Sequence, residues 1–285
     1  GKYVILGVTG PNEYENNVNN NWYTNYIARW CLQYTLASMD TVKNNYPEAW
    51  PHITEKASWR ENERNEWSSI IEKIYLPEDP EKEIFLQQDG FLDKEIIPVS
   101  ELPAEHRPIN QKWSWDRILR SCYIKQADVL QGIYFFIDDF TEELVEQNFD
   151  FYEPLTVHES SLSPCVHSIL ASYLGRSEKA YEMYLRTSRL DLDDYNNDTE
   201  DGLHITSMAG TWMSIVKGFG GMMVVDDQLH LKPQLPKNWN TLSFSILFRG
   251  HKLKVNITIA GTEVVNFGDE QININLNGKL TELVP

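Results

Sequence analysis

The chain has 285 residues, with 25 Lys and Arg against 42 Asp and Glu, which gives a formal net charge of −17. No basic stripe appears along the sequence, so nucleic acid and anionic membrane surfaces are poor partners. No stretch approaches the roughly 18 uninterrupted apolar residues that are typical of a membrane-spanning helix. The three cysteines, Cys31, Cys122 and Cys165, are odd in number and widely spaced, which favours a reducing cytoplasm and disfavours a disulfide framework or a zinc site.

The first segment is an apolar run that ends in a loop rich in glycine and asparagine, residues 7–21. Two carboxylates, Glu13 and Glu15, lie in this loop, and three aromatic residues lie in or next to it: Tyr14, Trp22 and Tyr23. Amides and carboxylates hydrogen-bond sugar hydroxyls, and aromatic rings cover the apolar face of a pyranose. Crowding by these rings would desolvate a carboxyl, raise its pKa and keep it protonated as a general acid. The alternative is an Asn-rich turn that caps the next helix.

Two long helices are predicted next. Apolar residues recur at helical spacing from Tyr23 until Pro47, which predicts a helix with one buried stripe. A second helical pattern runs from about Glu55 to Tyr75. Five prolines and several aromatic residues then occur between residues 77 and 108, which predicts an ordered loop that lies over a pocket.

The following stretch, residues 113–130, has a pattern that suits a helix with Lys125 on its apolar face. A lysine there either extends its amine to the surface or faces an anion or a sugar. Further on, Thr141 is a predicted N-cap, because two glutamates follow it in the first turn of a short helix.

A polar loop precedes the next predicted helix, which begins near Val166. Four side chains crowd this loop: His158, Ser160, Ser161 and Ser163. Hydroxyls and free backbone N–H groups at a helix N-terminus bind anions, so the loop is a candidate anion site. A serine-rich N-cap without a ligand is the alternative.

Three more helices are expected. Residues 166–174 and 177–190 form a predicted antiparallel pair that turns at Gly175, and a further helix follows His204. Its predicted inward face is Ile205, Met208, Ala209, Trp212, Ile215, Val216 and Phe219. The imidazole of His204 would lie at a helix N-terminus, where it could hold an anion or serve as a structural residue.

The period changes from helix to strand beyond Met222. Apolar residues alternate over 242–248 and 253–259, on either side of Arg249-Gly250, which predicts a hairpin with one buried face and further strands to Leu283. The fold class is therefore mainly α with a C-terminal β domain, and the expected domains are residues 1–221 and 222–285.

One string carries a specific resemblance. Thr9-Gly-Pro-Asn-Glu-Tyr-Glu-Asn-Asn-Val-Asn-Asn-Asn-Trp-Tyr-Thr-Asn25 resembles the catalytic-acid segment of the family 65 disaccharide phosphorylases. The similarity extends across almost the whole chain and matches the C-terminal part of a longer enzyme. It implies that residues 1–221 are the C-terminal part of an (α/α)6 helical barrel and residues 222–285 a small antiparallel β-sandwich or sheet. Because the chain also begins without an initiator Met, we expect a fragment that is inactive alone and exposes Trp30, Trp59 and Trp67.

The resemblance also assigns site residues. Glu13 matches the general acid, and Lys125 and Gln126 in Ile124-Lys-Gln-Ala-Asp-Val-Leu130 match the donor-sugar contacts. The phosphate contacts that the resemblance implies are Ser160, Ser161 and His204.

The implied reaction is inverting phosphorolysis of an α-linked glucose disaccharide, which yields β-D-glucose 1-phosphate and a free sugar. Phosphate is already an anionic nucleophile, so no carboxylate base is needed, and a carboxylate facing it in a dry site would repel it by several kcal/mol. The Asn-rich form of residues 13–17 favours maltose over trehalose, kojibiose and nigerose. The resemblance further implies a homodimer of the full-length enzyme, with inorganic phosphate as co-substrate.

Three alternatives stay open. A serine hydrolase could use His158 and Ser160, but the sequence lacks a GxSxG elbow and the two residues are poorly spaced. A glucoamylase-like hydrolase would need a second carboxylate where the serine-rich loop lies. A carbohydrate-binding module without turnover would not need the pairing of an acid with an anion site. No GxGxxG, Walker, HExxH or Cys/His pattern indicates a cofactor or metal.

Overall fold

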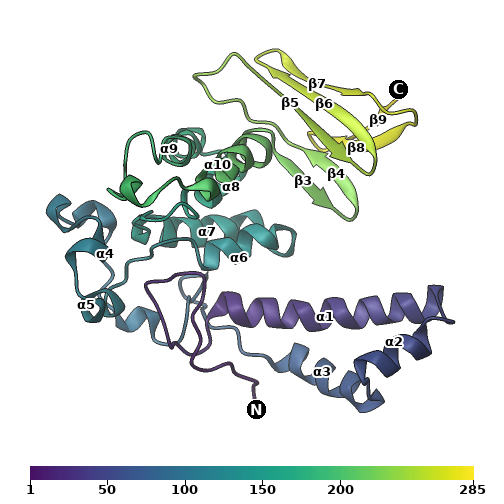
Figure 1. Ribbon diagram of the computed structural model, residues 1–285, viewed down its shortest axis with the longest axis horizontal. Helices are drawn as coiled ribbons and strands as arrows, with labels where there is room; N and C mark the ends of the chain where they lie inside the picture. The colour runs from purple at the N-terminus through teal and green to yellow at the C-terminus, as the bar shows by residue number, and fades with distance from the viewer.

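The computed structural model describes residues 1–285, with helices up to residue 219 and strands dominating the remainder (Figure 1). The α-helices are α1 (Trp22–Asn45), α2 (Trp50–Ala57), α3 (Glu61–Lys73), α4 (Ile109–Lys112), α5 (Trp115–Arg120), α6 (Val129–Phe135), α7 (Glu142–Tyr152), α8 (Pro164–Tyr173), α9 (Ser177–Ser188) and α10 (Ile205–Met213). A π-helical segment, η7 (Ser214–Phe219), continues α10. The short 3₁₀ turns are η1 (Phe91–Asp93), η2 (Val99–Glu101), η3 (Ala104–His106), η4 (Ile137–Asp139), η5 (Glu153–Leu155) and η6 (Thr199–Asp201).

The strands form three sheets. A two-stranded piece pairs β1 (Glu78–Asp79) with β2 (Ile84–Phe85) inside the proline-rich loop. The other strands are β3 (Met222–Val225), β4 (Gln228–Leu231), β5 (Thr241–Phe248), β6 (His251–Thr258), β7 (Gly261–Asn266), β8 (Ile272–Leu276) and β9 (Lys279–Leu283). They lie in the orders β3-β4-β8-β9 and β5-β6-β7, and all neighbours are antiparallel except β4 and β8.

Helix α1 confirms the first predicted helix, but only its N-terminal end is buried. The side chain of Asn21 caps it by accepting a hydrogen bond from the backbone N–H of Thr24 at 2.9 Å. Trp22 and Tyr26 are buried, whereas Trp30 is 39% exposed and the following turns are mostly exposed. The predicted continuous buried stripe is therefore wrong, because α1 extends away from the body of the molecule and has only the short helices α2 and α3 along one side of it (Figure 1).

The second predicted helix is two helices. The chain breaks at Ser58, which has a left-handed backbone with φ of 54°, and α3 starts after Arg60. The backbone N–H of Arg60 donates to the Glu63 carboxylate at 2.9 Å, so a new cap forms where the pattern predicted continuity. Trp59 and Trp67 pack edge to face at 5.1 Å across the break and are half-buried, so only Trp30 of the three is clearly exposed.

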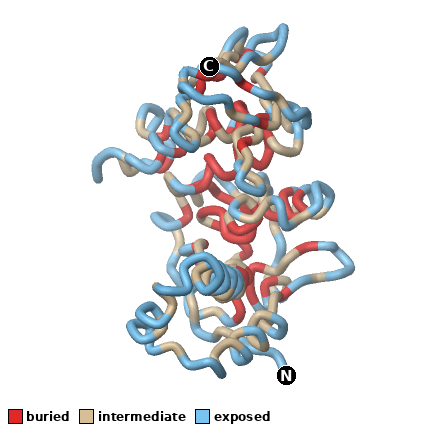
Figure 2. The backbone as a smooth tube through the Cα atoms, turned by 90° about the vertical axis from the view of Figure 1, so that its right-hand side faces the viewer, coloured by how far each residue is buried: buried red, intermediate tan, exposed pale blue.

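The main core lies where α6, α7 and α8 meet the N-terminal loop and α1. Figure 2 shows the buried residues concentrated in this central part of the molecule. Trp22 is fully buried and stacks on Phe85 of the proline-rich loop, with ring centroids 4.5 Å apart. Fully burying one such side chain contributes about 1.5–3 kcal/mol, so the loop is held as part of the core and is ordered as predicted.

The crossing of α1 and α6 depends on Gly132. A Cβ atom there would meet the Trp22 ring at 2.6 Å. We expect Gly132→Ala to lower the free energy of unfolding by up to about 2 kcal/mol, because overpacking costs about 1–3 kcal/mol and the gain in helix propensity offsets roughly 1 kcal/mol of it. Urea unfolding measures the change. Gly218→Ala is the control, since the nearest atom to its new Cβ lies at 3.6 Å, and equal effects of both substitutions would contradict the clash.

Helices α8 and α9 form the predicted antiparallel pair, and α10 packs against both. Gly175 makes the turn between them with φ of 71°, a conformation that suits glycine. The inward face of α10 consists of small residues, Ser207 and Gly210, while Ile205 and Trp212 are 68% and 51% exposed. The predicted apolar inward face is therefore wrong for the first half of this helix, because close approach to α8 and α9 admits only small side chains.

The hairpin of β5 and β6 is confirmed, with Arg249 and Gly250 both at positive φ in its two-residue turn. A separate hydrophobic cluster in the strands contains Leu229, Leu253 and Ile274. We propose residue 221 as the domain boundary, because the two buried clusters lie on either side of it. No helix is long and apolar enough to cross a membrane, and the three cysteines are free thiols.

Candidate active site

The acid loop, which we define as residues 7–21, is fixed by the side chain of Asn12. Its Oδ1 accepts hydrogen bonds from the backbone N–H groups of Tyr14 at 3.2 Å and Lys125 at 3.0 Å. The backbone N–H of Asn12 donates to Asp128 Oδ2 at 3.1 Å. Because Asn12 and Asp128 are buried, this arrangement holds Glu13 beside the segment that carries Lys125.

Glu13 and Lys125 form an ion pair at the surface of the loop. The Lys125 Nζ lies 2.5 Å from Glu13 Oε2, and the Glu13 side chain is 54% exposed. The hydrogen bond from Lys125 lowers the pKa of Glu13, although partial burial opposes the shift. The predicted raised pKa is therefore wrong for Glu13 in this structure. The side chain keeps contact with water, and the Lys125 cation stabilises its charged form. Glu15, by contrast, is buried and pairs with Lys94.

Lys125 does not lie on a helix. Helix α5 ends at Arg120, and Ile124 forms a parallel bridge with Thr156 before α6 begins at Val129. The prediction of one helix is therefore wrong for residues 121–128, because the bridge to Thr156 holds the backbone extended there, whereas α5 is helical as predicted. Lys125 nevertheless faces an anion, the Glu13 carboxylate, and Gln126 is buried with its Oε1 free of hydrogen bonds.

A cleft of about 620 Å³ connects the acid loop to the N-terminal ends of α8 and α10. Glu13 and Gln126 line it together with Leu162 and Thr206. A cavity of this size accommodates a small sugar. The remaining lining residues are mainly apolar or aromatic, including Tyr134, Phe135 and Met213.

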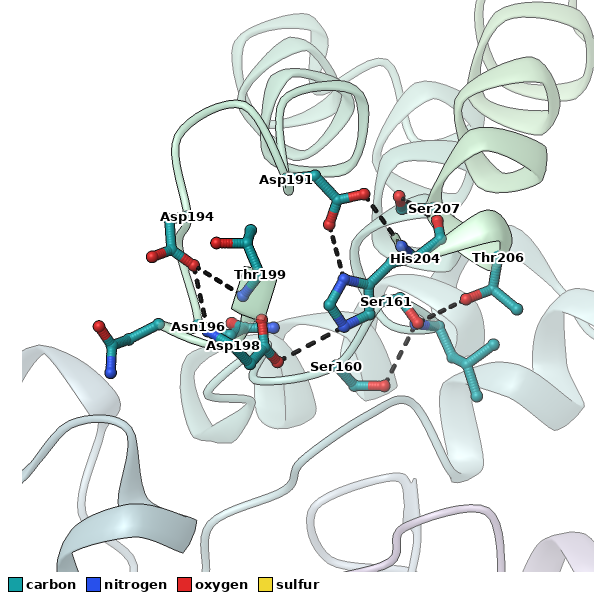
Figure 3. A network of polar contacts seen from close by, with 12 residues as sticks. Ser160, Ser161, Asp191, Asp194, Asn196, Asp198, Thr199, His204, Thr206 and Ser207 are labelled. Carbon is teal, nitrogen blue, oxygen red and sulfur yellow. Dashed lines mark hydrogen bonds and ion pairs between the residues drawn. The ribbon is translucent and has the colours of Figure 1, made fainter. Parts of the chain in front are cut away.

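The serine loop, residues 158–163, contributes two hydroxyls near this cleft. Ser161 Oγ lies 2.5 Å from Thr206 Oγ1, and Ser160 Oγ accepts from the backbone N–H of Leu162 at 3.2 Å (Figure 3). His158 and Ser163 point inward, where His158 Nδ1 and Ser163 Oγ are 2.8 Å apart. The prediction that all four side chains converge is therefore wrong. Ser163 is completely buried, so a substrate cannot reach its hydroxyl, and the pair of Ser163 and His158 cannot serve as the nucleophile and base of a hydrolase.

His204 is held between two aspartates at the start of α10. Its Nδ1 lies 2.6 Å from Asp191 Oδ1, and its Nε2 lies 3.5 Å from Asp198 Oδ2 (Figure 3). The backbone N–H of His204 also donates to Asp191 at 2.9 Å, and despite the opposing effect of burial these hydrogen bonds lower the pKa of Asp191. The sequence predicted no carboxylate that faces phosphate, and the structure places two aspartates beside His204. Sequence spacing contained no signal for either aspartate or for Thr206.

A second polar cluster lies apart from the cleft. Atoms of Glu153, His158 and His167 that could ligate a metal lie within 4.8 Å of one another. However, Lys179 contacts Glu153 at 3.0 Å, and Arg186 donates to the backbone carbonyl of His158 at 2.9 Å. Burial and then the nearby His167 and cations depress the pKa of His158. These positive charges oppose a divalent cation, and the cluster supports no metal site.

Asp128 gives the acid loop a pH-dependent stability. Burial raises its pKa to about 7, despite hydrogen bonds from Asn12 and Asn21, against about 3.9 in an unfolded chain. The native state therefore binds the extra proton, so this residue reduces stability as pH rises from about 4 to 7. Relative to Asp128→Asn, the wild type should lose about 3–4 kcal/mol of unfolding free energy over that window. Urea unfolding at several pH values tests this, and parallel curves for the two proteins would contradict the raised pKa.

Comparisons with known proteins identify the family. Residues 1–213 match the glycosyl hydrolase family 65 central catalytic domain, and residues 222–283 match the glycosyl hydrolase family 65 C-terminal domain. The chain therefore belongs to glycosyl hydrolase family 65, a family of carbohydrate-active enzymes. The catalytic domain of this family is an (α/α)6 barrel, so the helices belong to that barrel, as predicted.

Several relatives are phosphorylases. The maltose phosphorylase of Bacillus subtilis is 55% identical over 90% of this chain and 33% of its own length. The α,α-trehalose phosphorylase of Thermoanaerobacter brockii and the kojibiose phosphorylase of Halothermothrix orenii are 42% and 37% identical, with the same coverage. One solved structure, from the human microbiome, carries a provisional name as a kojibiose phosphorylase. It is 38% identical to this chain and superimposes with a TM-score of 0.91, and the match covers 99% of this chain and 39% of the solved chain. The chain thus spans about a third of the length of these curated relatives.

Proposed function

We propose that the protein catalyses inverting phosphorolysis of maltose, converting maltose and phosphate into β-D-glucose 1-phosphate and D-glucose. The observation that carries this proposal is a cleft with Glu13 and Gln126 at one side and Leu162 and Thr206 at the other. Ser161 joins it through its contact with Thr206. The maltose, trehalose and kojibiose phosphorylases among the relatives support a disaccharide as the substrate.

In the proposed mechanism, Glu13 donates a proton to the glycosidic oxygen while phosphate attacks the anomeric carbon from the opposite face. The C–O bond to the leaving glucose breaks as the new C–O bond to phosphate forms, which inverts the configuration. Glu13 must be protonated for this step, yet its ion pair with Lys125 favours the carboxylate. If Lys125 turns to a hydroxyl of the donor sugar, the lost pairing raises the pKa of Glu13 and promotes proton uptake.

Phosphate would be bound by Ser160, Ser161 and His204. Serine hydroxyls and the His204 imidazolium, which donates from both ring nitrogens, replace the carboxylate base that an inverting hydrolase uses to activate water. Asp191 fixes the His204 ring through Nδ1, which leaves Nε2 as the atom that would face phosphate. Because Asp198 lies 3.5 Å from Nε2, phosphate binding requires this carboxylate to move away.

Glucoamylase-like hydrolysis is the second candidate, and the position of Asp198 favours it. A carboxylate near the far face of the sugar could act as a general base for water. The hydroxyls of the serine loop favour an anion binder instead, because they can donate hydrogen bonds to phosphate.

The deciding assay uses the protein expressed from its complete gene. Maltose is supplied with and without inorganic phosphate, and glucose and glucose 1-phosphate are both quantified. One glucose and one β-glucose 1-phosphate per maltose, only with phosphate, would establish the proposal. Two glucoses without phosphate would make the protein a hydrolase. Trehalose, kojibiose and nigerose in parallel test the choice of disaccharide.

We also propose a homodimer in the cytoplasm, where the three thiols stay reduced. The family resemblance supports the dimer, and light scattering of the complete protein measures it.

A further inference from the structure

A buried hydrogen bond joins the acid loop to the serine loop. The Tyr14 hydroxyl donates to Glu159 Oε2 at 2.8 Å across 145 positions of sequence. Tyr14 is 1% exposed and Glu159 is 6% exposed. Tyr14 is the neighbour of Glu13 in sequence, and Glu159 is the neighbour of Ser160, so the bond lies one residue from each half of the proposed site.

The surroundings hold both partners rigidly. Glu159 Oε2 also accepts from the backbone N–H of Ile109 at 2.7 Å, and Oε1 accepts from Arg107 Nε at 3.3 Å. Arg107 donates in addition to the carbonyl of Val157 at 2.5 Å, which ties the start of the serine loop to the same cluster. The Tyr14 ring packs edge-on against Trp115 with centroids 6.2 Å apart. A buried carboxylate with three donors fixes its partners more tightly than an exposed pair would.

Phosphorolysis makes the spacing of the two loops important. The acid must reach the glycosidic oxygen while phosphate reaches the anomeric carbon from the other face, and a misplacement of about 1 Å can cost about 100-fold in rate. Glu13 itself is half exposed, and its ion pair is with the side chain of Lys125 at the surface. Its position relative to the serine loop therefore depends on the backbone beside it, which Tyr14 anchors.

We propose that the Tyr14–Glu159 hydrogen bond is a clamp that positions the general acid relative to the phosphate site. Tyr14 and Glu159 act as positioning residues and do not touch the substrate. The inference rests on the proposed function, because it assigns the clamp to the spacing between Glu13 and phosphate. Burial and Glu159 raise the pKa of Tyr14, so the hydroxyl stays a donor throughout the physiological pH range.

Tyr14→Phe removes the hydroxyl and leaves the ring. Two glucosyl-donor substrates, maltose and α-D-glucosyl fluoride, then reveal whether the general acid Glu13 is displaced. Maltose needs protonation of its leaving oxygen, whereas α-D-glucosyl fluoride releases fluoride ion, which needs little assistance. In the assay, each substrate is incubated with phosphate and the complete protein. We expect kcat for maltose to fall about 10- to 100-fold and kcat for the fluoride to fall less than about threefold. Thermal unfolding reports the folded fraction of the variant.

Tyr26→Phe is the matched control. The Tyr26 hydroxyl also donates to a carboxylate, Asp139 Oδ2 at 2.5 Å, and Tyr26 is 4% exposed, but it joins neither loop. This variant should lose stability without changing the ratio of the two rates. Glu159→Gln keeps an acceptor for Tyr14 and should preserve more of the maltose rate than Tyr14→Phe does.

Two results would overturn the clamp: equal losses for both donors in Tyr14→Phe, or a folded variant with the wild-type maltose rate. The proposed function fails separately, if the wild-type protein releases glucose without phosphate. Even then the ratio of the maltose rate to the α-D-glucosyl fluoride rate, compared between Tyr14→Phe and the wild type, shows whether the clamp positions Glu13, because a hydrolase needs the same general acid. A wild-type protein inactive on both donors would overturn both proposals.

Discussion

Glu13→Gln should lower kcat for maltose phosphorolysis by about 10²- to 10⁴-fold, the range that general acid catalysis contributes. The amide cannot supply the proton that the leaving glucose oxygen needs. Binding should change little, because Gln126 and the apolar lining of the cleft are untouched. Initial rates of glucose 1-phosphate release measure the loss, and α-D-glucosyl fluoride should retain most of its rate.

Glu15→Gln distinguishes the two carboxylates of the acid loop. Glu15 is buried and paired with Lys94, which also donates to the carbonyls of Leu119 and Ser121 at 3.0 and 2.9 Å. Its substitution should lower the unfolding temperature, because it leaves a buried lysine without its counter-charge. The rates with maltose and with α-D-glucosyl fluoride should then fall together, in proportion to the fraction of folded protein.

Unchanged activity in Glu13→Gln would remove Glu13 from the mechanism.

His204→Ala and Ser161→Ala should each raise the apparent KM for phosphate by about 10- to 100-fold. Each removes one hydrogen bond to a charged group, worth about 1.5–3 kcal/mol, and about 1.4 kcal/mol corresponds to a factor of ten. The KM for maltose should change far less. Initial rates over a matrix of both substrate concentrations separate the two constants.

Asp198→Asn should act in the opposite direction and lower the KM for phosphate. The carboxylate lies 3.5 Å from His204 Nε2, where it competes with the anion, and an amide of the same shape does not repel phosphate. Replacement of the partner on the other side, Asp191→Asn, should raise the KM, because Asn has only one acceptor oxygen for the two groups that Asp191 receives, the His204 Nδ1–H and the His204 backbone N–H. If only the maltose KM moves in these variants, the phosphate site lies elsewhere.

Local patterns in the sequence determined much of the fold. The 3.6-residue period predicted α1, the capping residue Thr141 predicted α7, and the alternation around Arg249-Gly250 predicted the hairpin of β5 and β6. Each of these signals depends on residues close together in the chain. The same local signals failed at two places. A left-handed residue, Ser58, interrupts one predicted helix, and a bridge between the distant residues Ile124 and Thr156 interrupts the one predicted over 113–130.

Residue identity also fixed which side chains could serve as acid, sugar contacts and anion donors, since the motif segments carry Glu13, Lys125 and His204 together with their neighbours. The tertiary structure alone decided what these groups touch. Lys125 meets Glu13 across 112 positions, and Tyr14 meets Glu159 across 145. Such contacts follow from how the helices pack, and packing also turned the apolar side of α10 outward because only small residues fit against α8 and α9. Spacing along the chain constrains neighbours within a few turns, whereas the electrostatic state of a site depends on groups that only the folded chain brings together.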